Sequence, residues 1–464
     1  MALHVVILAA GKGTRMKSSR PKVLHPLAGR LVIEHVLRAV DALRADSTVV
    51  VIGHGADDVR TALAPRASLQ FAVQSPQLGT GHALLQAESA LAGKTGTVLL
   101  VYADVPLLQA STLSRLIEHH RATRAAATVL TTELAEPYGY GRIVRDSSGR
   151  IARIVEERDA SGAEREIREI NSGIYCFDAA PLFGALKQLA ADNAQGEYYL
   201  TDLVAAYRHD RRVVETLQID SPAELRGINS RVDLSELGAV LRARKNQDVM
   251  IGGVTLEDAA STYIDADVTI GADTVIGPGV ILQGSTSIGE RCEIQAGSRI
   301  SNSTIADGVI VLDHSVVVES RVDTGARIGP FSHLRPGSVV STDAHVGNFV
   351  ELKKTTLGAK SKANHLAYLG DATIGERVNI GAGTITCNYD GVSKHPTVIE
   401  DGVFIGSDSQ LIAPVRIGAN AYVAAGSSIT KDVPADALGV ARGHQENKPG
   451  WAAKRRARHS KGSS

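Results

Sequence analysis

The sequence predicts a chain of two structural classes, an N-terminal doubly wound α/β domain and a C-terminal all-β rod of hexapeptide repeats. Residues 1–227 alternate apolar runs with helical patterns. Residues 228–250 form one helical stretch, and in residues 251–445 aliphatic side chains return at every sixth position. Because these three stretches follow different periods, we expect two domains joined by a helical linker. Residues 446–464 are basic and polar, and we expect a disordered tail there.

Length and composition agree with two folded domains. The chain has 464 residues, 44% of them hydrophobic, and its 50 Lys and Arg balance 50 Asp and Glu. This balance gives no reason to expect nucleic acid or an anionic membrane as a partner. Cys176, Cys292 and Cys387 form no CxxC pair, so neither a disulfide framework nor a zinc site is expected. With no apolar run near the roughly 18 residues of a membrane helix and no basic leader, the sequence predicts a cytoplasmic protein.

Five apolar runs predict the strands of the first domain. They lie at residues 3–10, 48–54, 69–74, 97–104 and 127–134. Patterns between them predict helices at 80–91, with Thr80 as N-cap, and at 111–124. Runs that are apolar throughout and separated by helices indicate a mainly parallel sheet covered on both faces. The stretch 141–157 instead predicts an edge hairpin that turns at "SSG".

The linker and the rod are predicted from periodicity. Leu234, Leu237 and Leu241 form one helical stripe in the linker. In the rod the six-residue period runs from Ile264 to Ile300, from Val316 to Leu352, from Tyr368 to Thr386 and from Ile399 to Ile429. Glycine often follows, where it permits the backbone angles of a turn. This period is typical of a parallel β-helix, in which stacked coils of three repeats bury the recurring side chains.

Two stretches interrupt the period, residues 353–367 and 387–397, and we expect both to be loops inserted into the rod. Loops that leave a rigid solenoid are common places for function. The first stretch carries His365, and Glu351 comes before it on a predicted strand. Because a rod also exposes flat faces and coil ends, self-association is expected.

A glycine-rich loop follows the first predicted strand. The sequence "LAAGKGTRM" (8–16) lacks the GxxxxGK[ST] of a P-loop, and Met16 stands where a dinucleotide fingerprint has its third glycine. Glycine lets backbone N–H groups approach phosphate oxygens, while Lys12, Arg15 and Lys22 add positive charge. The pattern therefore predicts a phosphate-binding loop.

Asp104 ends the apolar run 97–104, at the carboxyl end of a predicted parallel strand, where open α/β sheets bind ligands. A carboxylate there suits Mg²⁺, which binds few protein oxygens and keeps waters and substrate phosphates as its other ligands. The alternative interpretation is an aspartate that starts the turn before Pro106. A second glycine loop, "QLGTGHA" (77–83), precedes a helix and suits a base or a phosphate.

Several motifs of the first domain occur together in a familiar order: "LAAGKGTRM…PK", "QLGTGHA", "YAD", "GYGRI", "VEE", "EINSGIY" and "GIN". This order resembles that of sugar-1-phosphate nucleotidyltransferases, which have a Rossmann-like domain. With the repeat rod behind them, residues 3–445 resemble the bacterial family of bifunctional N-acetylglucosamine-1-phosphate uridyltransferases and glucosamine-1-phosphate N-acetyltransferases. The resemblance implies an enzyme that makes UDP-N-acetylglucosamine, which feeds peptidoglycan and lipopolysaccharide synthesis.

The resemblance implies a uridyltransferase site in the first domain. The residues implied to hold UTP are Leu8, Ala9, Ala10, Gly11, Arg15, Lys22, Gln74, Gly79, Thr80, Tyr102, Ala103 and Asp104. Those implied to hold N-acetylglucosamine-1-phosphate are Gly141, Glu156, Asn171 and Asn229. Asp104 and Asn229 are also implied to bind Mg²⁺. The family often has glycine at position 103, so Ala103 is a small departure.

The resemblance implies an acetyltransferase site on a left-handed rod. His365 is implied to take a proton from the amine of glucosamine-1-phosphate, and Glu351 stands where it could orient the imidazole. The residues implied to bind that substrate are Arg335, Lys353, Tyr368 and Asn379. Those implied to bind acetyl-CoA are Ala382, Asn388, Tyr389, Ser407, Ala425 and Arg442. The family forms homotrimers through the rod, so a homotrimer is expected here.

Two other functions fit parts of the sequence. A monofunctional sugar-1-phosphate nucleotidyltransferase would carry a structural rod, shorter than this one and without the His365 stretch and the "NYDG" loop. A regulatory scaffold that has lost catalysis would not need Lys22, Asp104 and Asn229, all of which are present.

Overall fold

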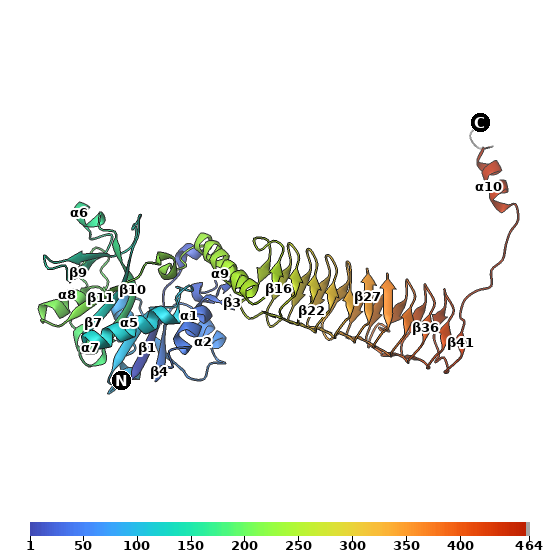
Figure 1. The fold of residues 1–464 in the computed structure, drawn as a ribbon, viewed down its shortest axis with the longest axis horizontal. Helices are drawn as coiled ribbons and strands as arrows, with labels where there is room; N and C mark the ends of the chain where they lie inside the picture. Colours follow the sequence, from blue (N-terminus) through green and yellow to red (C-terminus); the bar gives the residue numbers. More distant parts are fainter. Residues whose placement is uncertain (461–464) are drawn as a thin grey trace. The chain divides into compact units, whose positions relative to one another are not determined.

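The chain folds into two compact units. The structure is a computed structural model that describes residues 1–460, so the last four residues of the predicted tail lie outside the described residues. The first unit covers Met1–Arg242 and the second begins at Ala243. Figure 1 shows an α/β unit in blue to green and a rod of stacked strands in yellow to red. Each unit is described by itself.

The first unit is built on one mixed sheet, in the order β11-β7-β10-β6-β1-β4-β5. Its strands are β1 (Leu3–Ala9), β4 (Ser47–Ile52), β5 (Leu69–Val73), β6 (Thr97–Tyr102), β7 (Ala127–Glu133), β10 (Glu169–Asp178) and β11 (Val214–Gln218). β1 pairs in parallel with β4 on one side and β6 on the other, while β10 runs antiparallel to β6 and β7. The five strands predicted from apolar runs are confirmed, and β10 and β11 join them.

Helices cover both faces of this sheet, as predicted for a doubly wound domain. They are α1 (Val32–Asp41), α2 (Ala56–Ala62), α3 (Thr80–Leu85), α4 (Glu88–Leu91), α5 (Ala110–Thr123), α6 (Gly162–Arg165), α7 (Ala179–Leu186) and α8 (Asp202–His209). Val5 and Ile7 of β1 pack with residues of α1 and α5 in one apolar cluster. Their neighbours Val6 and Leu8 pack with residues of α3, α7 and α8 in another. Successive side chains of β1 thus point to opposite faces of the sheet, and helices bury both faces.

One predicted helix boundary in this unit is wrong. Thr80 is the first residue of α3 rather than its N-cap, which is Gly79, and the predicted helix 80–91 is divided into α3 and α4. Gly79 has φ 101°, and a Cβ there would lie 2.8 Å from the carbonyl oxygen of Tyr198. Backbone packing against Tyr198 therefore selects a glycine at the cap where a side-chain oxygen would otherwise be favoured.

The predicted edge hairpin is confirmed. β8 (Arg142–Arg145) and β9 (Ile151–Val155) pair antiparallel, and β8 also contacts β10 through Arg142 and Ile170. The hairpin therefore projects from the sheet beside the strand that carries the "EINSGIY" motif. This placement brings the ends of β8 and β9 to the same edge as Asn171.

Helix α9 (Arg231–Ile251) forms where the sequence predicts a helical linker, and the division between the units falls within it. In its first half Leu237 is buried, with Leu234 and Leu241 beside it, in a cluster of the first unit that includes Met16. In its second half Asn246 donates hydrogen bonds to the carbonyl oxygens of Ala259 and Thr262, both in the second unit. The helix is thus tied by side chains at both ends.

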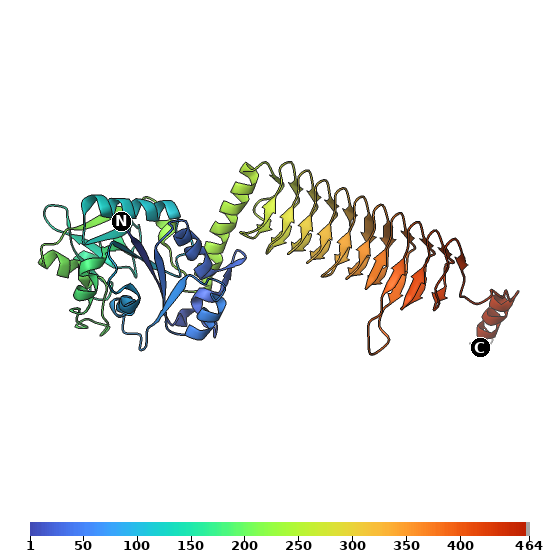
Figure 2. The ribbon, with the colours of Figure 1, turned by 90° about the horizontal axis from the view of Figure 1, so that it is seen from below.

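The second unit is a parallel β-helix. Its strands, from β12 (Thr255–Leu256) to β41 (Leu438–Gly439), are short and form three parallel sheets of 11, 10 and 9 strands within the described residues. Each strand pairs with the strand one coil later, as when Ile264 pairs with Leu282. Aliphatic side chains from all three sheets fill a single continuous core along the rod. The hexapeptide prediction is confirmed (Figure 2).

The structure corrects the phase of the repeat. Val317 is fully buried while Val316 is only half-buried, and Leu369 is buried in place of Tyr368. The reason is coil length, because some coils contain 17 residues instead of 18. Ile288, for example, pairs with Ile305 seventeen positions later. Each shortened coil moves the inward-facing position by one residue relative to a strict six-residue count.

The first of the two predicted insertions is wrong. Residues 353–367 are no loop but part of a regular coil that contains β29 (Thr356–Leu357) and β30 (Lys362–His365). β30 pairs in parallel with both β27 (His345–Asn348) and β33 (Asn379–Ile380). The interruption in the sequence was the one-residue shortening of the coil, which moves the aliphatic positions out of step.

The second predicted insertion is confirmed as a loop. Thr373 pairs with Val398, so this coil takes 25 residues. The extra residues lie between β34 (Ile385–Cys387) and β35 (Thr397–Ile399) and leave the rod as a long loop, visible in orange in Figure 2. A small bridge between Tyr389 and Lys394 closes it.

The C-terminal tail differs from the disorder expected of it. Helix α10 (Trp451–Ser460) forms there, with the Arg455 guanidinium 5.6 Å from the centre of the Trp451 ring. Its side chains are exposed over residues 451–458. Across residues 1–460, no helix combines the length and the apolar character that a membrane span requires.

The corrected repeat phase gives a matched pair of substitutions. We predict that Val317→Ala lowers the free energy of unfolding by about 1–3 kcal/mol, because it empties space in a fully buried position. Val316→Ala removes the same atoms one residue earlier and should cost less than about 1 kcal/mol, since Val316 is half-buried. Urea denaturation of the full chain, followed by circular dichroism, measures both. An equal or larger loss for Val316→Ala contradicts the register.

Candidate active sites

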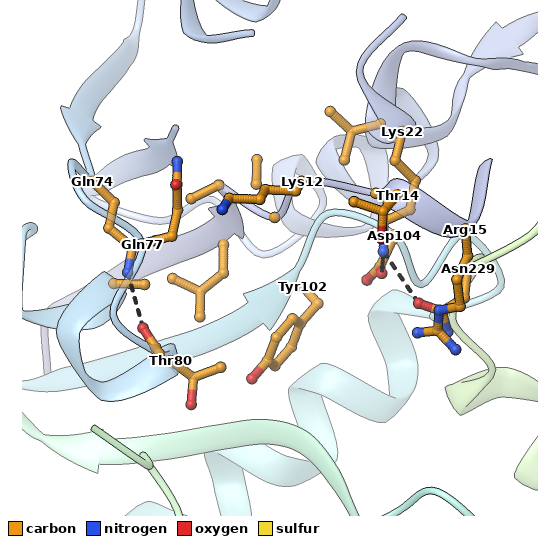
Figure 3. A pocket seen from close by; sticks show the side chains of 18 of the residues that line it. Lys12, Thr14, Arg15, Lys22, Gln74, Gln77, Thr80, Tyr102, Asp104 and Asn229 are labelled. Atoms are coloured by element: carbon orange, nitrogen blue, oxygen red, sulfur yellow. Dashed lines mark hydrogen bonds and ion pairs between the residues drawn. The ribbon is translucent and has the colours of Figure 1, made fainter. Parts of the chain in front are cut away.

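A cleft of about 520 Å³ opens at the carboxyl ends of β1 and β6 in the first unit. Of the predicted nucleotide residues, it is lined by Leu8, Ala9, Ala10, Gly11, Arg15, Lys22, Gln74, Gly79, Thr80, Tyr102 and Asp104 (Figure 3). Lys12 of the predicted phosphate-binding loop and Gln77 of the second glycine loop also line it, together with Glu197, which the sequence analysis did not single out. Strands β1 and β6 are adjacent and parallel, so the loops that follow them meet over one edge of the sheet.

Ala103 is the exception among the predicted nucleotide residues. Its side chain is fully buried in the apolar cluster that contains α1 and α5, and its N–H donates to the carbonyl oxygen of Leu8. Successive residues at the end of β6 point to opposite faces, so Tyr102 lines the cleft while Ala103 packs beneath it. A methyl group suits this buried position.

The glycine-rich loop is held by close backbone contacts. Gly13 has φ 59°, and a Cβ there would lie 2.9 Å from the Cβ of Lys22. The loop therefore packs directly against the segment that carries Lys22, and the 3-10 helix η1 (Thr14–Met16) follows it. Lys12 and Arg15 project from this loop among the side chains that line the cleft (Figure 3). The arrangement presents backbone N–H groups and two cations to an anion.

Lys22 lies between the two residues implied to bind metal. Its ammonium forms an ion pair with the carboxylate of Asp104 and lies 3.4 Å from Oδ1 of Asn229. Asp104 follows β6, and its carbonyl oxygen accepts a hydrogen bond from the N–H of Ile228, which positions the neighbouring Asn229. A carboxylate oxygen and an amide oxygen thus face one shared cation position, as Figure 3 shows.

A second cleft of about 460 Å³ adjoins the first and shares Arg15, Thr80, Tyr102, Asp104 and Asn229 with it. The predicted sugar residues Gly141, Glu156 and Asn171 line this second cleft. It is formed by the loop before β8, the end of β9 and the start of β10. The structure therefore brings the two predicted sets of residues in the first unit into adjoining clefts that meet at Asp104.

Two polar residues of this second cleft, Glu156 and Asn171, have hydrogen-bond partners within the unit. Burial raises the pKa of Glu156, and its carboxylate accepts a hydrogen bond from the hydroxyl of Thr201 at 3.2 Å. Oδ1 of Asn171 accepts from the hydroxyl of Tyr175 at 2.9 Å. A Cβ on Gly141 would lie 3.2 Å from the side chain of Ile154, so glycine keeps this wall of the cleft open.

A buried ion pair that the sequence analysis missed lies behind this wall. Arg142 is 2% exposed, and its guanidinium donates to the carboxylate of Glu157 at 2.7 Å and to the carbonyl oxygen of Tyr140. The same carboxylate accepts a hydrogen bond from the N–H of Gly139. The pair therefore ties the segment before β8 to the residue after Glu156. The only sequence signal was an arginine and a glutamate, each next to a predicted sugar residue.

The predicted base, His365, lies at the end of β30 on the rod. Its Nδ1 is 2.9 Å from Oδ1 of Asn348, which occupies the paired position on β27 one coil earlier. Glu351, which the sequence analysis placed to orient the imidazole, instead forms an ion pair with Arg335 at 2.8 Å. That suggestion is wrong, because Glu351 and Arg335 share a sheet that His365 does not belong to.

The predicted residues around His365 converge on one part of the rod. Lys353 pairs with Asp371 at 3.2 Å, and Asp371 also accepts a hydrogen bond from the side chain of Asn388. A Cβ on Gly370 would lie 2.5 Å from the hydroxyl of Tyr368 and 2.8 Å from Nδ2 of Asn388, so these two side chains meet over a glycine. Asn379 lies on β33, beside β30.

Lys394 joins this group from the inserted loop and was missed. The ammonium of Lys353 lowers the pKa of Lys394. Two adjacent ammonium groups with the Arg335 guanidinium near the same strands indicate an anion-binding position. The signal available in the sequence was a lysine within a loop that leaves the rod, at "VSK" after "NYDG".

Most of the predicted acetyl-CoA residues stand in one line along a corner of the rod. The N–H of Asp408 donates to the carbonyl oxygen of Ala382, and the N–H of Gly426 donates to that of Ser407. Arg442 donates from its guanidinium to the carbonyl oxygen of Ala425 at 2.8 Å. Since Gly383 donates in turn to the carbonyl oxygen of Leu366, the line begins beside His365. Asn388 and Tyr389 lie at the base of the inserted loop.

The fold and these two sites define a two-domain transferase, with a nucleotide-binding α/β unit and a hexapeptide β-helix. Models of known families agree: a MobA-like NTP transferase domain matches residues 5–206, and a bacterial transferase hexapeptide model matches residues 396–431. A GMPPB C-terminal domain model matches residues 259–363.

Similar proteins cover nearly the whole chain. Bifunctional protein GlmU of Trichlorobacter lovleyi is 52% identical over 97% of this chain and 98% of its own length. The same protein of Brevibacillus brevis is 50% identical over 97% of both chains, and that of Listeria monocytogenes serovar 1/2a is 48% identical over 99% of both. A solved structure from Bacillus anthracis, described as a "Putative Glucose-1-Phosphate Thymidylyltransferase", is 20% identical, covers 52% of this chain and 96% of its own, and has a TM-score of 0.42.

The chain therefore belongs to the family of bifunctional GlmU proteins. It is accordingly an enzyme with two transferase activities, a uridyltransferase in the α/β unit and an acetyltransferase in the hexapeptide unit. The membership overturns both alternatives, the monofunctional nucleotidyltransferase and the scaffold without catalysis.

The buried pair behind the sugar cleft gives a prediction about binding. Arg142→Met frees the segment before β8, so KM for the sugar phosphate should rise about tenfold or more while KM for UTP changes less than about twofold. Glu157→Gln keeps one hydrogen-bonding oxygen and should give a smaller rise. Arg153→Met, on the exposed pair with Glu164 in the same hairpin, is the matched control. Steady-state kinetics that show both KM values rising together contradict the prediction.

Proposed function

We propose that the two adjoining clefts of the first unit bind UTP and N-acetylglucosamine-1-phosphate and join them into UDP-N-acetylglucosamine. The observation that carries this proposal is the position of Lys22, whose ammonium lies between Asp104 and Asn229 where the two clefts meet. A transferred phosphoryl group needs positive charge at that boundary. Pyrophosphate leaves as the sugar phosphate oxygen bonds to the α-phosphorus of UTP.

The cleft residues act by positioning and by charge. A sugar phosphate is already ionised near neutral pH, so the attacking oxygen needs no general base. Lys12, Arg15 and Lys22 offset the negative charge of the phosphates, while Glu156 and Asn171 hold the sugar with their fixed oxygens. The glycine-rich loop adds backbone N–H donors.

The same site has donors suited to Mg²⁺. Across residues 1–460 no group of three or more His, Cys, Asp or Glu side chains is arranged to hold a metal. A site with one carboxylate and one amide oxygen, from Asp104 and Asn229, fits Mg²⁺ because that ion takes its other ligands from water and substrate phosphates. Both oxygens already face one cation, the ammonium of Lys22. When bound, Mg²⁺ neutralises charge on the phosphates.

We propose that the rod site transfers an acetyl group to glucosamine-1-phosphate. The amine nitrogen forms a bond to the thioester carbonyl carbon of acetyl-CoA, and the carbon–sulfur bond breaks to release CoA. His365 takes the proton that the amine loses. Arg335, Lys353 and Lys394 bind the phosphate, while Tyr368 and Asn379 contact the sugar. Ala382, Asn388, Tyr389, Ser407, Ala425 and Arg442 line the path of acetyl-CoA.

The two reactions form a sequence. The rod site makes N-acetylglucosamine-1-phosphate, which is the sugar substrate proposed for the α/β site. The final product is UDP-N-acetylglucosamine, the activated sugar for peptidoglycan and lipopolysaccharide synthesis. Both sites therefore serve one product.

Substitutions in the two units should separate the activities. Asp104→Ala removes a charged oxygen from the meeting point of the clefts, so uridyl transfer should fall at least about 100-fold at saturating Mg²⁺ while acetyl transfer persists. His365→Ala should cut acetyl transfer about 10²- to 10⁴-fold and spare uridyl transfer. Pyrophosphate release and CoA release measure the two reactions. Near-normal uridyl transfer in Asp104→Ala contradicts the first assignment, and near-normal acetyl transfer in His365→Ala contradicts the second.

We propose further that the enzyme is a homotrimer formed through the rod. An apolar stripe of His314, Phe331, Phe349 and Leu366 runs along one corner, with the rings of Phe331 and Phe349 stacked 5.6 Å apart. Phe331 is 50% exposed and Leu366 is 62% exposed. The stripe ends at the residue next to His365. A second copy that covers it would therefore close the acetyltransferase site.

The stripe gives a test of assembly. Phe331→Asp with Phe349→Asp places charge on the stripe and should convert the trimer to monomers, with loss of acetyl transfer and retention of uridyl transfer. Val392→Asp, at an exposed aliphatic residue in the inserted loop, is the matched control and should leave the trimer intact. Sedimentation velocity measures the mass. A double variant that stays trimeric excludes the stripe as the contact surface.

A further inference from the structure

Within residues 1–460, the side chain hydrogen-bonded to the imidazole of His365 is that of Asn348. Nδ1 of His365 lies 2.9 Å from Oδ1 of Asn348. A carboxamide oxygen can only accept a hydrogen bond, so Nδ1 must carry the proton in this contact. The lone pair of the neutral ring is then on Nε2, the nitrogen that faces away from Asn348.

The two residues are held together by the backbone of two coils. Asn348 pairs with His365 in the register of β27 and β30, and the N–H of Leu366 donates to the carbonyl oxygen of Asn348 at 3.1 Å. Gly347 lies against the preceding position of β30, where a Cβ would collide with the carbonyl oxygen of Asn364. The two strands therefore approach closely one residue before the Asn348–His365 contact.

The corners that follow the two residues match each other. Phe349 has φ 57° and Leu366 has φ 49°, so both strands turn away in the left-handed region directly after Asn348 and His365. Non-glycine residues adopt this region only when the surrounding structure favours it. Because the two corners stack, the side chains of Asn348 and His365 emerge from the rod at equivalent points. The contact thus follows from the coil geometry and not from a chance rotamer.

We infer that Asn348 is a positioning residue for acetyl transfer, which holds the imidazole of His365 with Nδ1 protonated and Nε2 free to accept the proton of the substrate amine. The inference rests on the proposed role of His365 as the base. The neutral amide accepts the Nδ1 hydrogen without adding charge, so it fixes the tautomer while leaving the basicity of the ring to the other groups nearby.

The other titratable groups near the imidazole of His365 are few and mostly cationic. Lys362 lies three residues before His365 on β30, and His345 lies opposite Lys362 on β27. Burial, then Arg327, Lys362 and His365, lower the pKa of His345. Across the corner, Glu351 is already bound to Arg335. A carboxylate introduced at position 348 would therefore be the one anion in direct contact with the imidazole.

Two substitutions distinguish positioning from a structural role. Asn348→Ala removes the acceptor, so kcat for acetyl transfer should fall about 10- to 100-fold with KM for glucosamine-1-phosphate within about twofold. Asn348→Asp keeps an acceptor but adds a negative charge that favours the imidazolium. The acidic limb of kcat/KM against pH should then move up by about one pH unit, with activity largely restored above that limb.

The full-length enzyme is used throughout, and CoA release is followed from about pH 5.5 to 9. Titration of the substrate amine contributes equally to every variant, so only differences between variants are interpreted. His345→Gln is the matched control: it removes the other histidine of these paired strands, whose charge interacts with that of His365, and should move the acidic limb less than Asn348→Asp does. Uridyl transfer and the thermal midpoint of each variant verify that the chain is folded.

The outcomes distinguish the positioning role of Asn348 from the role of His365 as the base. If His365→Ala abolishes acetyl transfer while Asn348→Ala keeps kcat within twofold, the positioning role is overturned and the base remains. An unmoved acidic limb in Asn348→Asp also overturns it. If His365→Ala itself retains normal acetyl transfer, the proposed base fails, and the role of Asn348 fails with it.

Discussion

The second unit depends on one constraint, the parallel pairing of each short strand with the strand one coil later. This pairing decides which residues become neighbours, because in most coils a residue meets its partner 17 or 18 positions along the chain and not the residues beside it in sequence. It stacks aliphatic side chains into one core and, at the same time, aligns polar side chains on the outer surface. Asn348 and His365 meet for the same reason that Val346 and Ala363 do.

The first unit uses the equivalent constraint in a different form. Parallel pairing of β1 with β6 brings the loops after these strands to one edge, so a glycine-rich loop from position 11 and a carboxylate from position 104 face each other. Antiparallel β10 and the β8–β9 hairpin then close the sugar side. The cation of Lys22 holds the two sides together at Asp104 and Asn229.

The sequence predicted the classes of structure, and most of its predicted site residues lie together in the structure. The places where it differs from the structure have physical causes. Periodicity revealed the coils, but a count by sixes cannot distinguish a one-residue shortening from an insertion, so the regular coil with His365 was taken for a loop. Ala103 was assigned to the segment that faces the nucleotide, and strand alternation places its side chain in the core. Glu351 was suggested to orient His365 because it is expected on the same strand face as Lys353. The actual partner, Asn348, is neutral and is found only when the coil length is known.

The chemistry proposed for the rod depends on two opposite changes in coil length. Shortened coils keep Asn348 and His365 on strands, where backbone pairing on both sides limits their movement. The lengthened coil releases the loop that carries Lys394 to the side of Lys353. A base must present one nitrogen within a narrow geometry, whereas a cation that binds a phosphate tolerates a range of positions. Since the entropy cost of loop closure grows slowly with length, the rod can carry the cation on a long loop at little cost. The proposed base instead lies on a strand, where backbone pairing limits its movement.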